Sequence, residues 1–263
     1  MNIDELDFLS QDEKSYLNKI LDDCHKGFLE RINMTEEEYS ELCKPYLAEC
    51  SAYTDVIKSN KNRKSELHKA LMNNTARVEK SIGGKSIHRG FYCPSPVQDI
   101  VIGNNNRGRL CRADNPKADY TYYFDSNNKH IATQQENRTE YISYYENKSL
   151  GLLFSENHFV SISECEYDEN GRISSYINIL CNADSDNVFE YDKELYTYNE
   201  SELIVDHSHL AIFEPMVLSL NKYIFSIENG YLKSYRVDVF DTENISKTPL
   251  KSRTYKVKIK RKI

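Results

Sequence analysis

The strongest constraint on the fold is a series of hairpin signals in the second half of the chain. Asn170-Gly171 and Asn229-Gly230 each stand between two runs in which aromatic or aliphatic residues alternate with polar ones. An Asn-Gly pair in this setting favours a two-residue hairpin, because both residues tolerate the positive φ angles of a tight turn. Ser126-Asn127-Asn128 follows an aromatic run in the same way. Turns at such intervals predict an antiparallel meander of many short strands.

The expected strands are those runs that are rich in aromatic and β-branched residues. They lie at 120–125, 129–133, 141–145, 152–154, 159–163, 164–168, 172–177, 203–205, 210–213, 223–227 and 231–235, with one further short strand around 97–102. Of the 20 tyrosines, 14 fall in residues 119–246, as suits a sheet in which the ring packs and the hydroxyl reaches water. Tyr255, Val257 and Ile259 alternate with lysines, which predicts either an anion-binding strand or an edge strand protected by its lysines.

The first third of the chain has helical spacing. Ser10 with Glu13, and Thr35 with Glu38, are capping boxes, each followed by apolar residues at three- and four-residue steps. Pro45 is expected to kink the second helix or mark a boundary. A third helix is expected over 65–80, after an exposed loop at 58–64. We therefore predict an α+β protein, with a helical segment at 1–85 and a curved, mostly antiparallel sheet at 86–263, possible as one continuous domain.

Charge is distributed in blocks that the net value of -7 conceals. Residues 1–55 hold 5 basic and 14 acidic side chains, and residues 56–118 hold 13 basic and 4 acidic ones. Residues 119–246 hold 8 basic and 23 acidic side chains, whereas residues 247–263 hold 8 basic ones and no acidic ones. Surfaces polarised in this way either attract charged partners or pair with each other inside the fold.

Several classes of protein are excluded. No stretch of the sequence approaches the roughly 20 apolar residues of a membrane helix. The acidic start of the chain does not have the pattern of a signal peptide. The seven cysteines are scattered, without a C-x-x-C pair, as is typical of a reducing compartment. We therefore expect a cytoplasmic protein without a cofactor or a membrane partner.

Motifs for catalysis and metal binding are weak. His207 and His209 would share one face of a strand, a spacing that can bind a metal, but the sequence shows no third ligand. Asp184 to Asn187 begins like a calcium loop, but Phe189 stands where that loop needs glycine. We expect no metal and name no catalytic residue. An enzyme whose site is assembled from distant residues stays an open alternative.

A second alternative is a nucleic-acid or phosphate-binding protein. Its anion-binding residues would be the basic group His88, Arg89, Arg107, Arg109 and Arg112. Arginines close in sequence can hold phosphate or carboxylate in a bidentate manner. The same residues could instead pair with acidic groups of their own chain.

Two aromatic-Asp hairpin units, at 166–173 and 123–129, resemble the YD strand pattern of Rhs-type proteins. This pattern is also found in immunity proteins that are encoded beside bacterial polymorphic toxins. The resemblance covers roughly residues 119–240. It implies a single-chain inhibitor that binds a cationic toxin domain through an acidic and aromatic surface.

The expected contact surface for such a toxin follows from charge and aromatic density. It comprises Tyr144, Tyr145, Glu166, Asp168, Asp184, Asp186, Glu190, Tyr191, Asp192 and Glu194. Acidic groups would speed association, and tyrosines would supply the binding anchors. The leading hypothesis from the sequence is thus an immunity protein that neutralises a cationic toxin domain.

Overall fold

The sheet is a single antiparallel meander of 13 strands. We describe it in a computed structural model that places residues 10–32, 34–84, 88–101, 107–181, 187–212, 216–240, 249 and 251–257. From one edge to the other the strand order is β13-β12-β11-β10-β9-β8-β7-β6-β5-β4-β3-β1-β2. The strands are β1 Arg77–Ile82, β2 Arg109–Cys111, β3 Tyr120–Phe124, β4 His130–Gln135, β5 Arg138–Tyr145, β6 Lys148–Ser155, β7 His158–Tyr167, β8 Ile173–Cys181, β9 Val188–Tyr198, β10 Glu202–Ala211, β11 Val217–Glu228, β12 Tyr231–Phe240 and β13 Lys251–Lys256. The predicted fold class, a helical segment followed by an antiparallel sheet, is confirmed.

Three long helices precede most of the sheet in the chain: α1 Gln11–Ile32, α2 Glu36–Asn60 and α3 Lys64–Asn74. Both predicted capping boxes are present. The hydroxyl of Thr35 accepts the N–H of Glu38, while the Glu38 carboxylate accepts the N–H of Thr35. Pro45 lies inside α2, which continues through it. Since this part of α2 is exposed, water can bond the carbonyl left without its N–H donor.

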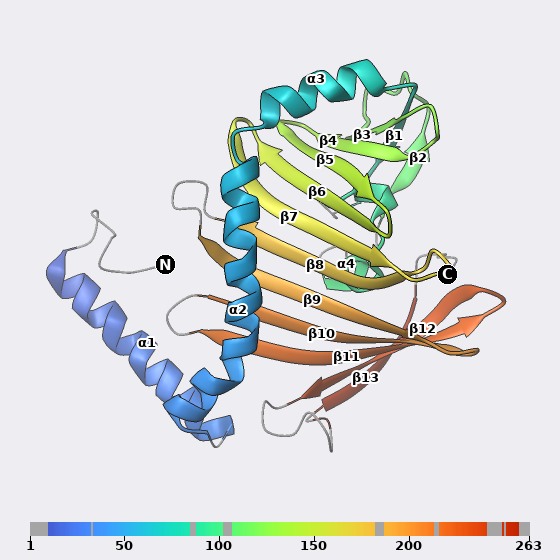
Figure 1. The fold of residues 1–263 in the computed structure, drawn as a ribbon. Coiled ribbons are helices and arrows are strands. Elements are labelled where there is room, and N and C mark those ends of the chain that lie inside the picture. The colour runs from blue at the N-terminus through green and yellow to red at the C-terminus, as the bar shows by residue number, and fades with distance from the viewer. Residues whose placement is uncertain are drawn as a thin grey trace.

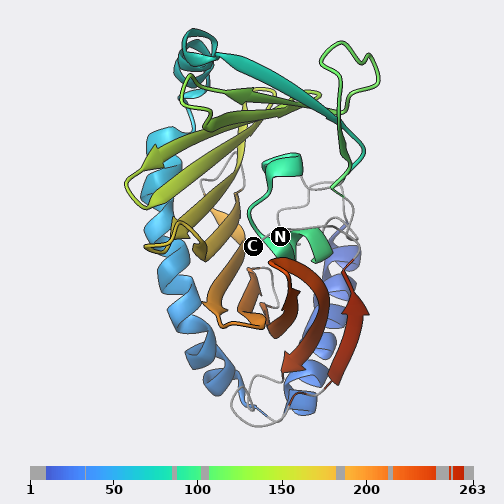
Figure 2. The ribbon, with the colours of Figure 1, turned by 90° about the vertical axis from the view of Figure 1, so that its right-hand side faces the viewer.

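The sheet curves, and its two faces are covered differently. Helix α2 crosses the convex face (Figure 1), whereas the short helices η2 (Gly90–Tyr92) and α4 (Pro96–Val101) lie inside the curl (Figure 2). Helix α1 meets the start of α2 and extends beyond the ends of the strands, while α3 lies across the β3–β5 end (Figure 1). The sheet is open, with β2 and β13 at its edges.

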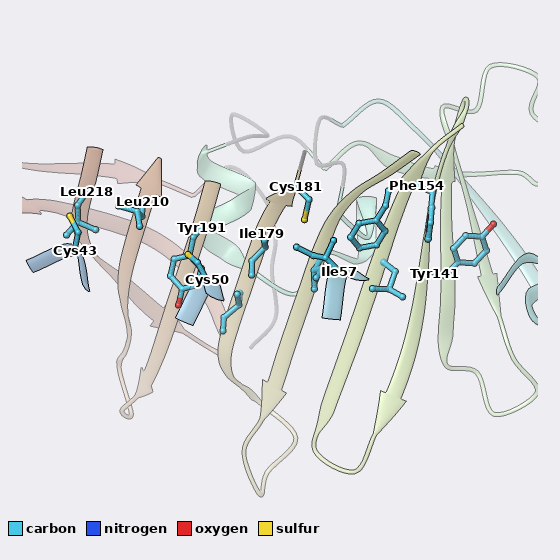
Figure 3. Close-up of a cluster of buried hydrophobic side chains, with 14 of the residues drawn as sticks. Cys43, Cys50, Ile57, Tyr141, Phe154, Ile179, Cys181, Tyr191, Leu210 and Leu218 are labelled. Atoms are coloured by element: carbon cyan, nitrogen blue, oxygen red, sulfur yellow. The ribbon is translucent and has the colours of Figure 1, made fainter. Parts of the chain in front are cut away.

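The larger core lies between α2 and the convex face. Cys43, Cys50 and Ile57 lie along one side of α2 and pack on strand residues that include Ile179 and Leu218 (Figure 3). Burial of an aliphatic side chain of this size contributes about 1.5–3 kcal/mol, so this seam holds the helix on the sheet. Polar contacts reinforce it, because the Tyr39 hydroxyl accepts the N–H of Leu218 at 2.7 Å.

The concave face has a second core. Val97 of α4 is fully buried among strand residues that include Tyr176, Val205, Tyr223 and Phe225. These residues come from β8, β10 and β11, so the sheet wraps around α4. Buried tyrosines therefore lie on both faces of the sheet, with Tyr141 and Tyr191 in the larger core and Tyr176 and Tyr223 in the second one.

The aromatic-Asp units form tight turns that the Asp side chain holds in place. In the Asp125 turn, Oδ1 accepts the N–H groups of Asn127 and Lys129. In the Asp168 turn, Oδ1 accepts those of Asn170 and Arg172. Local bonds of this kind are the reason why Asp is favoured at turns. The pattern that carries the resemblance to Rhs-type proteins thus has a structural role in both hairpins.

One predicted element is wrong in its last part and another is wrong in type. The expected helix over 65–80 ends at Asn74, and Arg77–Ile82 is strand β1, because its backbone pairs with β3 over five positions. Residues 97–102 were expected to form a strand, but Pro96–Val101 is α4. Ser95 is the reason, since its hydroxyl accepts the N–H of Gln98 and the following proline suits the first helical position.

Three smaller predictions also change. The exposed loop at 58–64 is shorter than expected, because α2 continues to Asn60, whose amide donates to the carbonyl of Val56. Of the two predicted Asn-Gly hairpins, the one at Asn229-Gly230 is confirmed. The one at Asn170-Gly171 is not a two-residue hairpin but part of a longer loop, since the N–H of Asp168 bonds the carbonyl of Arg172. Strand β9 falls in a region where the sequence predicted no strand.

Candidate functional site

Four buried charged side chains lie on the concave face, where segment 88–99 meets the sheet. Arg89, Glu140, Asp99 and Glu194 are each 4% exposed or less. Buried charges are costly unless they are paired and hydrogen-bonded. Their partners therefore show whether this region is a reactive centre or a structural one.

Arg89 and Glu140 form the first buried centre. The Glu140 carboxylate accepts the backbone N–H of Arg89 and, at 2.6 Å, the hydroxyl of Ser163. The Arg89 guanidinium donates to the hydroxyl of Ser149 at 3.0 Å, and its Nε lies 3.8 Å from Glu140 Oε1. His88 is also buried, with Nδ1 3.7 Å from Glu140 Oε1. This centre fastens the start of segment 88–99, which we call the inserted segment, to β5, β6 and β7.

The charge balance of this centre favours the ionised carboxylate. Burial by itself raises the pKa of Glu140, but contacts with His88 and the charge of Arg89 outweigh burial and lower it to about 2. The pKa of Arg89 is raised, since nearby anionic groups outweigh its burial. Both side chains stay charged over the ordinary pH range, as a permanent ion pair.

Glu194 anchors the other end of the inserted segment. Its carboxylate accepts the hydroxyl of Ser95 at 2.6 Å, the amide of Gln98 at 3.3 Å and the hydroxyl of Tyr196. Burial raises the pKa of Glu194 more than these bonds lower it. Because every one of these donors belongs to α4, its cap or β9, Glu194 holds α4 against the sheet.

A third group joins β9 to β10. Asp192 Oδ1 lies 3.0 Å from His207 Nε2 and 3.0 Å from His209 Nδ1. Burial raises the pKa of Asp192, but the two histidine contacts outweigh it and lower the pKa to about 2. The contact with Asp192 raises the pKa of His209. The predicted placement of both imidazoles on one face is confirmed, with Asp192 as the neighbour that the sequence did not reveal.

This third group is only partly open to solvent. Within the described ranges, no set of three His, Cys, Asp or Glu side chains is arranged to hold a metal ion. The side chain of His207 is 4% exposed, whereas that of His209 is 30% exposed. An acid–base catalyst must reach the proton that it transfers. Of this trio, His209 alone has a substantial path to solvent.

The structure divides the predicted toxin-contact residues between several places. Tyr191 and Glu194 are fully buried, and Asp192 is largely buried against histidines. Tyr191 faces α2, where its hydroxyl donates to Glu49, whereas Asp192 and Glu194 face the concave side. Of the others, Tyr145 is exposed. Four are half-buried: Tyr144, Glu166, Asp168 and Glu190. Asp184 and Asp186 lie outside the described residues. The described members do not come together in one surface.

Most of the predicted anion-binding residues pair within the chain. His88 and Arg89 lie beside Glu140, and the Arg107 guanidinium bonds Asp99 at 2.7 Å and the carbonyl of Phe91 at 3.0 Å. Arg109 in β2 and Arg112, which lies 3.4 Å from Asp114, are exposed. Four of these five residues, His88, Arg89, Arg107 and Arg112, thus contact acidic groups of the same molecule.

The acidic block of residues 1–55 forms an exposed surface on α1 and α2. We call it the acidic helical surface; its exposed carboxylates are Asp12, Glu13, Asp22, Asp23, Glu30, Glu36, Glu37, Glu38, Glu41 and Asp55. Along α1, Asp12, Tyr16, Ile20 and Asp23 follow one another at helical steps and share one stripe, which also includes the exposed Lys19. Tyr16 is 66% exposed and Ile20 is 38% exposed. The sequence signal for this surface is the excess of 14 acidic over 5 basic side chains in residues 1–55, whereas the predicted contact residues lie between Tyr144 and Glu194.

Comparisons of the chain with protein-family models, with curated proteins and with solved structures give no match. In the part of the chain that the structure describes, the helices are too short or too polar to cross a bilayer. The functional interpretation therefore rests on the geometry of these groups alone.

Proposed function

We propose that the protein is a protein-binding module that neutralises a cationic toxin domain, and that it binds this domain with the acidic helical surface. The observation that supports this most is the stripe on α1, where exposed Tyr16 and Ile20 lie between Asp12 and Asp23. Exposed apolar groups surrounded by polar ones are typical of protein-interaction sites. The carboxylates around them add attraction for a basic partner.

The arrangement of α1 suits this role. The helix extends away from the sheet, and its contact with the rest of the fold is near its end, where Leu29 is buried and Phe28 is half-buried (Figure 1). In its first four turns, α1 thus exposes most of its circumference to solvent. A helix displayed in this way can enter a groove of a partner through residues spaced three and four apart.

The buried centres on the concave face support the same interpretation in a different way. Arg89, Glu140 and Glu194 are enclosed and hydrogen-bonded within the chain. They give the sheet and its inserted segment a fixed shape, and they do not offer an anion or a substrate an open position. Recognition by the outer surface is therefore favoured over phosphate binding at Arg89.

Co-expression with the product of the neighbouring gene tests the proposal. We expect the full-length chain to protect cells from that product and to co-purify with it. A variant with Asp12→Asn, Asp23→Asn and Glu30→Gln should bind roughly 10-fold more weakly, since each charged contact at a rim contributes up to about 1 kcal/mol. The matched control is Glu146→Gln, Glu169→Gln and Glu200→Gln, three exposed carboxylates outside the helices.

Two results would overturn this proposal. One is the absence of both a complex and protection with the unmodified chain. The other is an equal loss of affinity in the helix variant and in the control, which would show that net charge and not the acidic helical surface determines binding.

A further inference from the structure

A cavity of about 350 Å³ lies between α3 and the β3–β5 end of the sheet. Its floor is apolar and comprises Leu67 and Leu71 of α3, Ile131 of β4 and Tyr141 of β5. Leu71 and Tyr141 are buried at 6% and 4% exposure, so this floor belongs to the main core. The volume lies at the lower end of the range of ligand pockets, which extends from about 300 to 1,000 Å³.

The rim of this cavity is polar and negative. Asp125 lines it together with Asn74, Ser126 and Asn127, and its lining includes no Lys or Arg side chain. Oδ1 of Asp125 is occupied by backbone N–H groups of its own turn. Those bonds fix the orientation of the carboxylate, which is half-buried, and they involve Oδ1.

The surrounding elements add to the negative potential. The last turn of α3 lines the cavity and contains no basic side chain, so the carbonyl end of the helix favours a cation there. Of the basic side chains nearby, Lys69 lies on the side of α3 opposite to the lining residues Leu67, Ala70 and Leu71. Lys129 lies over the ring of Tyr144, and the charge of Arg77, which donates to Asn128 of the Asp125 turn, is balanced by its ion pair with Glu79.

We propose that this cavity receives an arginine or lysine side chain of the cationic partner. The aliphatic stem of that side chain would lie on Leu67, Ile131 and Tyr141, and its charged head would reach Asp125 at the rim. Long basic side chains bury the stem and keep the head in a polar setting in this way. This inference rests on the proposed function, because it supplies a specific anchor for the same basic partner.

The test uses a small probe and does not require the partner. Butylguanidinium reproduces an arginine side chain, and butylurea is its neutral, nearly isosteric match. With the full-length protein, NMR titration should show butylguanidinium perturbing the signals of Leu67, Leu71 and Ile131, with butylurea about two- to fivefold weaker, as expected for a partly exposed charge pair.

Three variants sharpen the test. Asp125→Asn keeps an oxygen for the turn and should lower the affinity for butylguanidinium to that for butylurea. Ala70→Phe, at an exposed position that lines the cavity, should abolish binding of the probe. Met72→Phe is the matched control, since Met72 is 61% exposed on the same helix and does not line the cavity.

Equal binding of the two probes, or binding that survives Ala70→Phe, would overturn the inference. So would the absence of any perturbation at the cavity. These outcomes are distinct from failure of the proposed function, which is measured with the α1 variants and the neighbouring gene product. A partner that binds normally to Ala70→Phe would leave the acidic helical surface as the site and remove the cavity from it.

Discussion

Replacement of Glu140 by Gln should destabilise the protein far more than loss of a surface charge. The variant keeps the shape of the side chain but leaves the Arg89 guanidinium buried, at 3% exposure, without its anion. Removal of one partner from a buried ion pair costs about 3–5 kcal/mol. The pKa of Glu140 gives a consistent magnitude: lowering it from 4.5 to about 2 corresponds to about 3 kcal/mol.

Equilibrium denaturation in urea measures this loss, with Glu166→Gln as the control. Glu166 pairs with Lys148 at the surface, where the exposed fractions of the two side chains are 36% and 45%, so the control should lose less than about 1 kcal/mol. The double variant Arg89→Met with Glu140→Leu should recover part of the loss, because two buried charges are then absent. A loss below about 1 kcal/mol for Glu140→Gln would refute the claim that this pair fastens segment 88–99.

The same pair predicts a pH dependence. A carboxyl group whose pKa is lower in the folded state stabilises the protein above its unfolded pKa of about 4.5. This contribution is lost as the pH falls from there towards about 2, the folded value for Glu140. The Glu140→Gln variant should lack that part of the acid dependence. An unchanged slope between pH 5 and about 2 would contradict the assignment.

Three further substitutions test other parts of the fold by urea denaturation. Gly151→Ala should cost about 2–3 kcal/mol, because its Cβ would lie 2.3 Å from Glu140 Oε1; a neutral effect would show that the carboxylate can move. Glu136→Gly should stabilise by up to about 1 kcal/mol, since Glu136 has a φ of 50°; destabilisation would contradict the assigned turn. Asp168→Ala should cost about 1 kcal/mol through loss of two turn bonds, and an unchanged midpoint would refute their role.

The local parts of the fold were accessible from the sequence. The capping boxes at Ser10 and Thr35 and the Asn229-Gly230 hairpin each depend on residues a few positions apart. The sequence holds a further local signal, since Glu-Asn pairs at 136, 146 and 156 stand at ten-residue spacing and join successive strands. Strand β1 could not be recognised locally, because Val78 has helical spacing with Leu71 and its pairing partner lies in β3.

The interior charges were inaccessible for the same reason. Arg89 meets Glu140 across 51 positions, and Ser95 meets Glu194 across 99. Such pairs are fixed by the register of the sheet and by the path of segment 88–101. Basic residues close in sequence therefore indicated an anion site, whereas the fold places an acidic partner beside three of them. Exposure of α1 likewise depends on which face of the sheet α2 covers.

The most direct test of the acidic helical surface is the association rate with the neighbouring gene product, measured by stopped-flow fluorescence at increasing ionic strength. The association rate should fall steeply as salt rises, because exposed carboxylates steer a cationic partner. The variant with Asp12→Asn, Asp23→Asn and Glu30→Gln should associate more slowly and with a weaker dependence on salt. The same rate and salt dependence in this variant as in the unmodified chain would contradict recognition through α1 and α2.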